Sequence, residues 1–255
     1  MPFTVSHLAA ALPFRRLRLV WSAFLIGSVA PDFPYVLATT DYRDLGHRFP
    51  GLIEFTFPAA IAALWLFHQV IKLPAVGLLP VGIQRRLQAE LGEFKFGPPA
   101  RLAAILFSLT LGIVTHVVWD AFTHAFTWPW RRWLWLQAWI RVPLFGRVPM
   151  YMFLQYASTI IGLIALGIWF LLWYRDTTPS RQGPVTSHEY FPLAMLAVAI
   201  VAGLLRALLV IGMPKNLERL DAFLLVSGVT ALALVFWQVF LYCLMISTHQ
   251  TWTMS

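Results

Sequence analysis

The residues best suited to chemistry lie in the apolar stretch from Leu111 to Thr127, which reads LGIVTHVVWDAFTHAFT. It places His116, Asp120 and His124 at positions i, i+4 and i+8. On an α-helix this spacing puts the three side chains on one face, one turn apart. Ionisable side chains at membrane depth cost roughly 3 kcal/mol each and are rare unless they pair or bind metal. The row therefore predicts metal ligands. The alternative is that the two histidines only hydrogen-bond neighbouring helices, with Asp120 as their counter-charge.

The composition is that of a polytopic membrane protein. Of the 255 residues, 59% are hydrophobic and only 12% are charged, which is too apolar for an ordinary soluble domain. The net charge of +8 is typical of basic loops that face anionic lipid headgroups, and no segment predicts a nucleic-acid groove. The single cysteine, Cys243, excludes both an intramolecular disulfide and a metal site built from several thiolates.

Five apolar runs are long enough to cross a bilayer, which requires about 20 residues. They are Leu52 to Leu73, Leu102 to Ala125, Gln155 to Trp173, Phe191 to Met213 and Ala222 to Ile246. We therefore predict an all-α, polytopic membrane helical bundle that forms one domain over residues 1–255. Residues 1–51 are expected to form an N-terminal cap that carries a site loop, and residues 52–255 the bundle.

Two other segments are predicted to form helices at the membrane surface. The apolar stretch from Leu19 to Ala30 is too short to cross a bilayer. Residues 128–153 alternate tryptophan with arginine, and both side chains favour the headgroup layer. For the arginines of this second segment, binding of a lipid phosphate is the alternative.

The N-terminal cap supplies further candidate ligands. A Pro-Asp step ends the short apolar helix and projects Asp32 from its tip. Turn signals at Gly46 and at Pro50 predict that His47 lies in a constrained loop. Because consecutive spans run in opposite directions, the start of the first and the end of the second lie on one side of the membrane. The residues predicted to converge there are His7, Asp32, His47, His116, Asp120 and His124.

Nitrogen and oxygen donors without thiolates suit Zn²⁺, with Mn²⁺ or Fe²⁺ as alternatives. Six donors exceed the needs of one tetrahedral zinc, so two ions that share a bridging aspartate, about 3.5–4 Å apart, would use them better. Such a pair activates water for attack on an ester or phosphoester. The predicted catalytic set is Asp120, Arg48 as a phosphate clamp, and Asp44 or Glu54 as the hydrogen-bond partner of a ligand imidazole. The alternative for Arg48, Asp44 and Glu54 is that each is only a solvated loop charge without a role in the site.

Four segments carry a family resemblance: MPFTVSHLAAALPFRR, IGSVAPDFPY, GHRFPG and THVVWDAFTH. They resemble a family of bacterial integral-membrane proteins described only as a domain of unknown function. Their order is also similar to that in inner-membrane metal-dependent hydrolases and, more remotely, in zinc-dependent phospholipases C. The resemblance implies a location in the bacterial cytoplasmic (inner) membrane and a zinc-dependent hydrolytic activity.

The phospholipases order their ligands as His, Asp, His, a His-x-x-x-Asp pair and a further His. The six candidate residues of this chain follow that order. The chain departs from the pattern because it lacks a later His-x-x-x-Glu pair, and its N-terminus is not expected to be a removable segment that would free an amine ligand. The departures favour one or two ions over three.

Together these features predict a membrane-embedded metal-dependent hydrolase that acts on a lipid or lipid-linked (phospho)ester at the bilayer surface. Membrane lipid would then be both environment and substrate, with no nucleic-acid partner. The alternative is a non-catalytic membrane scaffold or ion-binding membrane protein, because no base or nucleophile motif accompanies the ligands. A transporter is not favoured, because the sequence has no repeated halves.

Overall fold

The computed structural model describes residues 4–38, 43–143, 146–181 and 190–252, with the backbone alone at residues 38, 43–44, 217–218 and 248–252. The chain divides into two compact units that interleave along the sequence. The first unit comprises Met1–Phe33, Tyr42–Ile61 and Phe96–Leu171, and the second comprises Pro34–Asp41, Ala62–Lys95 and Leu172–Ser255. The single domain expected from the sequence stays a prediction.

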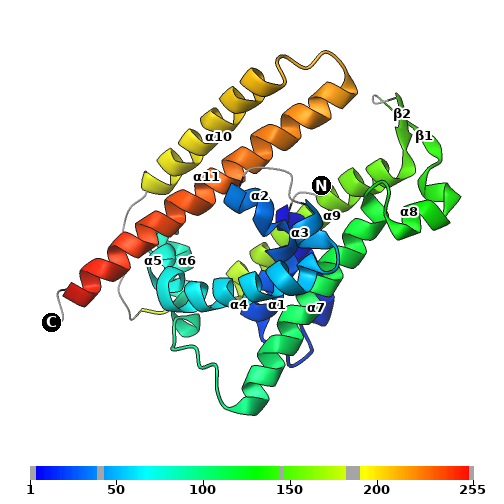
Figure 1. The fold of residues 1–255 in the computed structure, drawn as a ribbon. Helices are drawn as coiled ribbons and strands as arrows, with labels where there is room; N and C mark the ends of the chain where they lie inside the picture. Colours follow the sequence, from blue (N-terminus) through cyan, green and yellow to red (C-terminus); the bar gives the residue numbers. More distant parts are fainter. Residues whose placement is uncertain (1–3, 39–42, 144–145, 182–189, 253–255) are drawn as a thin grey trace. The chain divides into compact units, whose positions relative to one another are not determined.

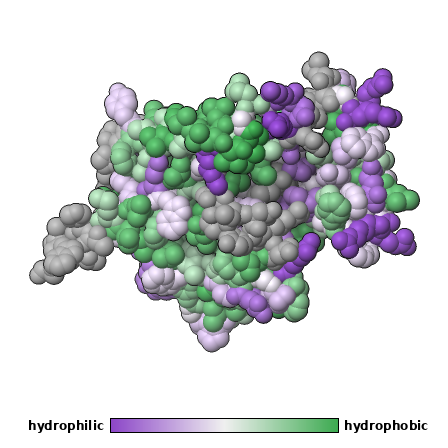
Figure 2. All heavy atoms as spheres, turned by 45° about the horizontal axis from the view of Figure 1, so that its top comes forward, coloured by the Kyte–Doolittle hydropathy of each residue, from purple (hydrophilic) through white to green (hydrophobic). Residues whose placement is uncertain are grey.

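Helices make up most of the described structure (Figure 1). Within the described residues, the helices long and apolar enough to cross a membrane are Leu52–Val76, Pro99–Arg132, Met150–Asp176, Phe191–Val210 and Arg219–Ser247. They correspond one to one with the five apolar runs, so the predicted all-α bundle with five spanning helices is confirmed. Hydrophobic side chains cover much of the visible surface (Figure 2), as expected where helices face lipid. By length and composition these helices identify an integral membrane protein.

The first unit contains the N-terminal segments and two of the long helices. Its elements are η1 (Thr4–Phe14), α1 (Trp21–Val29), η2 (Ala30–Asp32), α3 (Arg43–His47), η3 (Leu52–Thr56), the start of α4 (Phe57–Leu66), α7 (Pro99–Thr123), α8 (Trp128–Arg132), η6 (Leu134–Leu136), β1 (Trp139–Val142), β2 (Gly146–Pro149) and most of α9 (Met150–Asp176). The elements η1, η2 and η6 are 3₁₀ helices, and η3 is a π-helical turn.

Helices α1 and α7 cross with their backbones in close contact. A Cβ added at Gly27 would collide with the carbonyl of Leu109, and one added at Gly112 would collide with the carbonyl of Phe24. Small residues permit such close approach between helices in a membrane. The side chains of Phe24 and Leu109 are fully buried. The crossing therefore holds the short α1 firmly against α7.

The Trp/Arg-rich segment forms only the short helices α8 (Trp128–Arg132) and η6 (Leu134–Leu136) before α9 begins, and so differs from the predicted surface helix. Strands β1 and β2 follow as an antiparallel hairpin in which Val148 is buried and Trp139 is 63% exposed. Pro143 cannot donate a helical hydrogen bond, and Gly146 adopts a positive φ of 77°. These two residues turn the chain instead of letting it continue as a helix.

The second unit includes an antiparallel pair of long helices, α10 and α11, which lie side by side in Figure 1. Its elements are most of α2 (Phe33–Ala38), the end of α4, η4 (Phe67–Ile71), α5 (Lys72–Val76), α6 (Val81–Leu87), η5 (Gln88–Glu90), α10 (Phe191–Val210) and α11 (Leu217–Trp252). Arg206 lies within α10, where its Nη1 donates a hydrogen bond to Thr230 Oγ1 of α11 at 2.9 Å.

Candidate metal centre

All six predicted ligands lie in the first unit and come from several segments. His7 belongs to η1, Asp32 ends η2, His47 ends α3, His116 and Asp120 lie on α7, and His124 follows α7 directly. Five of them are buried, with exposed fractions of 1% for His7, 1% for Asp32, 0% for His116, 3% for Asp120 and 7% for His124. Ionisable groups buried this deeply require compensating partners.

Four donor atoms form the central donor set: Nε2 of His47, Nε2 of His116, Oδ1 of Asp32 and Oδ2 of Asp120. The two Nε2 atoms are 3.1 Å apart. His47 Nε2 lies 3.5 Å from the Asp32 oxygen and 3.2 Å from the Asp120 oxygen. His116 Nε2 lies 3.7 Å from each of these oxygens. Two ligands on a tetrahedral zinc, with bonds near 2.0–2.1 Å, are about 3.3 Å apart. His47, His116 and Asp120 therefore have a spacing that could hold one ion, and Asp32 belongs with His7 and His116 to a second such group.

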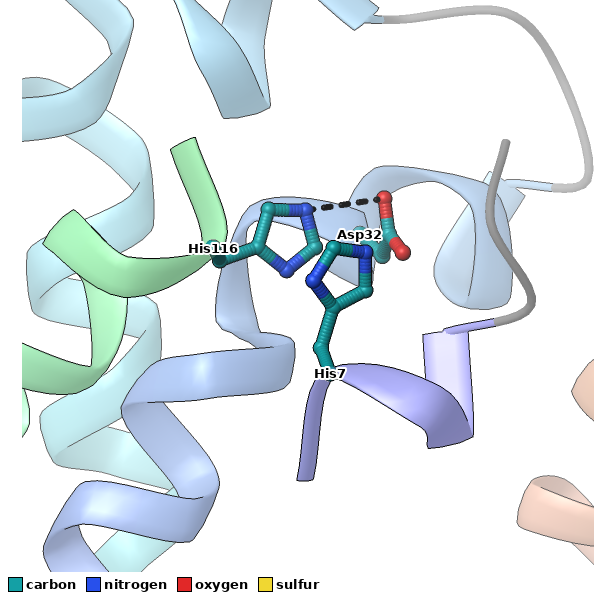
Figure 3. A group of neighbouring side chains, drawn as sticks. All are labelled: His7, Asp32 and His116. Atoms are coloured by element: carbon teal, nitrogen blue, oxygen red, sulfur yellow. Dashed lines mark ion pairs between the residues drawn. The ribbon is translucent and has the colours of Figure 1, made fainter. Parts of the chain in front are cut away.

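His7 contacts the other oxygen of the Asp120 carboxylate, and it also lies near Asp32 and His116. Its Nε2 is 3.3 Å from Asp120 Oδ1, and its ring stacks on that of His116 with centroids 3.8 Å apart. Figure 3 shows these two rings beside the Asp32 carboxylate. Burial lowers the pKa of His7 below its ordinary value of 6.5, which favours the neutral imidazole that binds metal. Asp120 thus faces His7 with one oxygen and the central donor set with the other, as a bridging carboxylate does.

Two hydrogen bonds aim ligand atoms at the centre. His116 Nδ1 lies 2.7 Å from the carbonyl oxygen of Ser28, which can only accept, so Nδ1 carries the proton. In the neutral ring this leaves the lone pair on Nε2 directed at the central donor set. Thr4 Oγ1 donates to Asp32 Oδ2 at 2.6 Å, while Asp32 Oδ1 faces the centre. Sequence reasoning missed both partners, because a backbone carbonyl and a single threonine give no pattern of their own.

His47 is positioned by close contact between α3 and η2. A Cβ added at Gly46 would collide with the carbonyl of Pro31, so the two segments touch through their backbones. Thr56 Oγ1 donates to the carbonyl of Gly46 at 3.1 Å. Glycine at position 46 therefore brings the neighbouring His47 to Asp32.

Several buried atoms of the cluster have no hydrogen-bond partner in the part of the chain that the structure describes. They are both ring nitrogens of His7, Oδ1 of Asp32 and Oδ1 of Asp120. The two carboxylate oxygens contact imidazole nitrogens only at 3.3–3.7 Å, and two buried carboxylates that face the same two imidazoles, His47 and His116, repel each other. A divalent cation would compensate both carboxylates and accept the imidazole lone pairs. The residues present therefore fit a metal ion.

The predicted row of three side chains on one helical face holds for His116 and Asp120 but is wrong for His124. Helix α7 ends at Thr123, and His124 is extended with φ −126° and ψ 147°. Its Nδ1 lies 3.0 Å from the backbone oxygen of Asp120 and 3.6 Å from Asp120 Oδ2. The helix stops because Thr127 Oγ1 donates to the carbonyl of Ala121 at 2.6 Å, a carbonyl that a continuing helix would use itself. His124 therefore borders the cluster through Asp120.

The remaining predicted site residues lie around this cluster. Arg48 lines an open pocket of about 510 Å³ together with His47 and Asp120. The backbone of Asp44 belongs to α3, but its side chain lies outside the described part of the structure. Glu54 is exposed on η3. Arg131, which the sequence assigned to the membrane surface, also lines the pocket.

No curated protein and no solved structure matches this chain. The similarity to metal-dependent hydrolases and to phospholipases C therefore stays a prediction. One family model, described as "Domain of unknown function (DUF4184)", matches residues 1–244. Because this match spans nearly the whole chain, including every residue of the buried His/Asp cluster, the protein belongs to the DUF4184 family.

Proposed function

We propose that the protein is a membrane-embedded metal-dependent hydrolase that acts on a lipid or lipid-linked phosphoester at the bilayer surface. The observation that carries this proposal is the central donor set, in which each of the two Nε2 atoms lies within 3.1 to 3.7 Å of the other three donor atoms. Two nitrogens and two oxygens without thiolate favour Zn²⁺, with Mn²⁺ or Fe²⁺ as alternatives.

A second ion has a partial ligand set next to the first. His7, Asp32 and His116 form a second buried group that could hold an ion, and His7 also lies 3.3 Å from Oδ1 of Asp120. In two-metal hydrolases a shared carboxylate holds the ions about 3.5–4 Å apart. His7 and Asp120 would contribute to this second position, with Asp120 as the bridge.

The hydrolytic part of the proposal rests on access to the centre. His47 and Asp120 line the open pocket and also belong to the central donor set. When bound, a divalent ion supplies activation of water and stabilises charge that develops on an ester oxygen. A substrate in the pocket would meet the centre at these two residues, while His7 and His116 remain shielded from solvent.

A non-catalytic ion-binding protein is the second candidate. Structural zinc sites are closed by four protein ligands, whereas catalytic sites keep one position open. If all four atoms of the central donor set bound one ion, the site would be of the closed type. Turnover in the presence of the bound metal distinguishes the two candidates.

The first experiment is elemental analysis of the protein purified in detergent. We expect one to two divalent ions per chain, as the donor set allows, and loss of the ions in Asp120→Asn and in His116→Ala. His68→Ala is the matched control, because His68 lies in the second unit, where it stacks on Phe94. Wild-type protein without zinc, manganese or iron, or an equal metal content in the Asp120 variant, would contradict the metal centre.

The second experiment tests hydrolysis. The wild type, loaded with the metal found in the first experiment, is incubated with dihexanoylphosphatidylcholine, and the water-soluble products are measured. We expect metal-dependent turnover that is lost in Asp120→Asn and retained in His68→Ala. Retention of metal without turnover on phospholipids of several headgroups would instead support the closed, non-catalytic site.

A further inference from the structure

A pocket lies at the edge of the metal centre and continues it outward. Its volume is about 510 Å³, and its lining includes His47, Arg48, Asp120, Phe126, Trp128 and Arg131. This volume is within the usual range of small-molecule sites, roughly 300–1,000 Å³. It can hold a headgroup-sized molecule in contact with the centre.

Two arginines from different segments line this pocket. Arg48 follows α3, whereas Arg131 lies in α8. Asp120 is the one acidic residue among the described lining residues, and the sequence holds no further acidic residue until Asp176. Guanidinium groups stay charged and bind phosphate oxygens through paired N–H groups. The polar part of the pocket therefore suits an anion with several oxygens.

Aromatic rings form the other part of the lining. Phe126 and Trp128 are 66% and 70% exposed, respectively. Phe126 adopts a φ of 64° where the chain reverses between α7 and α8, a backbone conformation that is unfavourable for a non-glycine residue. Thr127 holds the reversal through its hydrogen bond to the carbonyl of Ala121. Exposed rings of this kind favour the boundary between headgroups and acyl chains.

We propose that this pocket binds the phosphate group of an amphiphilic phosphate ester. Arg48 and Arg131 are the phosphate-binding pair, and Phe126 and Trp128 contact the apolar part of the ligand. Guanidinium groups pair with the charged oxygens of a phosphate and not with a neutral carboxylic ester, so the pair favours phosphate esters as the substrate class. The inference rests on the proposed function for the reaction, whereas binding itself requires only the pocket.

Equilibrium binding to the full chain in detergent tests the proposed phosphate site. Three ligands distinguish the contribution of the phosphate group from that of the acyl tails. Dihexanoyl phosphatidic acid carries both, glycerol 3-phosphate carries the phosphate alone, and dihexanoylglycerol carries the tails alone. We expect phosphatidic acid to bind at least tenfold more tightly than either of the other two. Equal binding of dihexanoylglycerol would overturn phosphate recognition. Equal binding of glycerol 3-phosphate would overturn the claim that the ligand is amphiphilic and would leave a soluble phosphate ester as the ligand.

Variants then locate the binding site. Arg131→Gln should weaken binding of phosphatidic acid about tenfold, and the double variant with Arg48→Gln should abolish it. Arg131→Lys should retain part of the binding, since it keeps the charge without the paired donors. Arg132→Gln is the matched control, because Arg132 is the exposed neighbour that is not among the lining residues. Unchanged binding in the double variant would overturn the assignment.

Metal analysis of the same samples keeps the two proposals apart. Arg131→Gln and the double variant with Arg48→Gln should hold as much metal as the wild type. Protein that binds phosphatidic acid through Arg48 and Arg131 but contains no metal would refute the metal centre and leave this inference standing. Protein that contains metal but does not distinguish phosphatidic acid from dihexanoylglycerol would refute this inference and leave the metal centre standing.

Discussion

At the scale of single residues, the cluster depends on groups that do not themselves reach its centre. The hydroxyl of Thr4 and the carbonyl of Ser28 each hold one ligand in the orientation that leaves its donor atom directed inward. Removal of such a partner typically lowers metal affinity about 10–100-fold without removing any ligand.

Thr4→Val is therefore expected to weaken metal binding about 10–100-fold. Valine has nearly the shape of threonine but cannot donate the 2.6 Å hydrogen bond to Asp32 Oδ2. Thr4→Ser keeps the donor and should keep the affinity. Titration with a competing chelator measures both. Equal affinities in the two variants would mean that this hydrogen bond does not orient Asp32.

His7→Ala should change the number of bound ions and not abolish binding. The central donor set does not include His7, which instead faces the far oxygen of Asp120. A protein that holds two ions should therefore retain one, and the ratio of metal to protein measures the change. If the variant lost all metal, His7 would have to belong to the first coordination sphere of a single ion.

The sequence was informative about residue types and less so about their surroundings. His7, Asp32, His47, His116 and Asp120 could be proposed as one cluster, because ionisable side chains are rare in apolar segments and topology places these on one side. Helix α7 ends just before His124, and no feature of the histidine itself indicates this. The end depends on Thr127, whose hydroxyl bonds back to the helix. Arg131 looked like a membrane anchor because its sequence neighbours are tryptophans.

At the scale of elements, glycines determine how closely the ligand-bearing segments approach. Gly46 brings α3 onto η2, and the pair Gly27 and Gly112 brings α1 onto α7. The apolar runs predicted the spanning helices well, since length and hydropathy suffice for that. The crossing of α1 and the hairpin of β1 and β2 depend on contacts between distant segments, which periodicity along one segment does not contain.

Gly46→Ala is expected to reduce stability by about 1–3 kcal/mol, as overpacking does, and to lower metal content as well. The added methyl group collides with the backbone of Pro31 and moves His47 away from Asp32. Gly92→Ala is the matched control, since nothing lies within 4 Å of the position that its methyl group would take. Thermal unfolding and elemental analysis follow the two effects. A Gly46 variant with normal metal content would show that the contact is not needed to place His47.

At the scale of the molecule, the cluster joins η1, η2, α3 and α7 within the first unit. A ligand that binds only the folded state raises the free energy of unfolding by about 1.4 kcal/mol for each tenfold increase above its Kd. Metal bound by these four segments should therefore stabilise the first unit as a whole.

Zinc is accordingly expected to raise the unfolding temperature of chelator-treated protein, and the rise should grow with zinc concentration. Differential scanning fluorimetry in detergent measures it. His116→Ala should show little rise, and His68→Ala should behave as the wild type. A similar rise in the His116 variant would place the stabilising zinc elsewhere on the protein.

The pocket has a further consequence for the rate at which metal leaves. His47 and Asp120 belong both to its lining and to the central donor set, whereas His7 and His116 are almost inaccessible. A departing ion would pass through this pocket, so a ligand bound there should block the exit and slow dissociation of the metal. Extraction of metal by a chromogenic chelator should slow when dihexanoyl phosphatidic acid saturates the wild type, and should not slow in the Arg48→Gln, Arg131→Gln double variant.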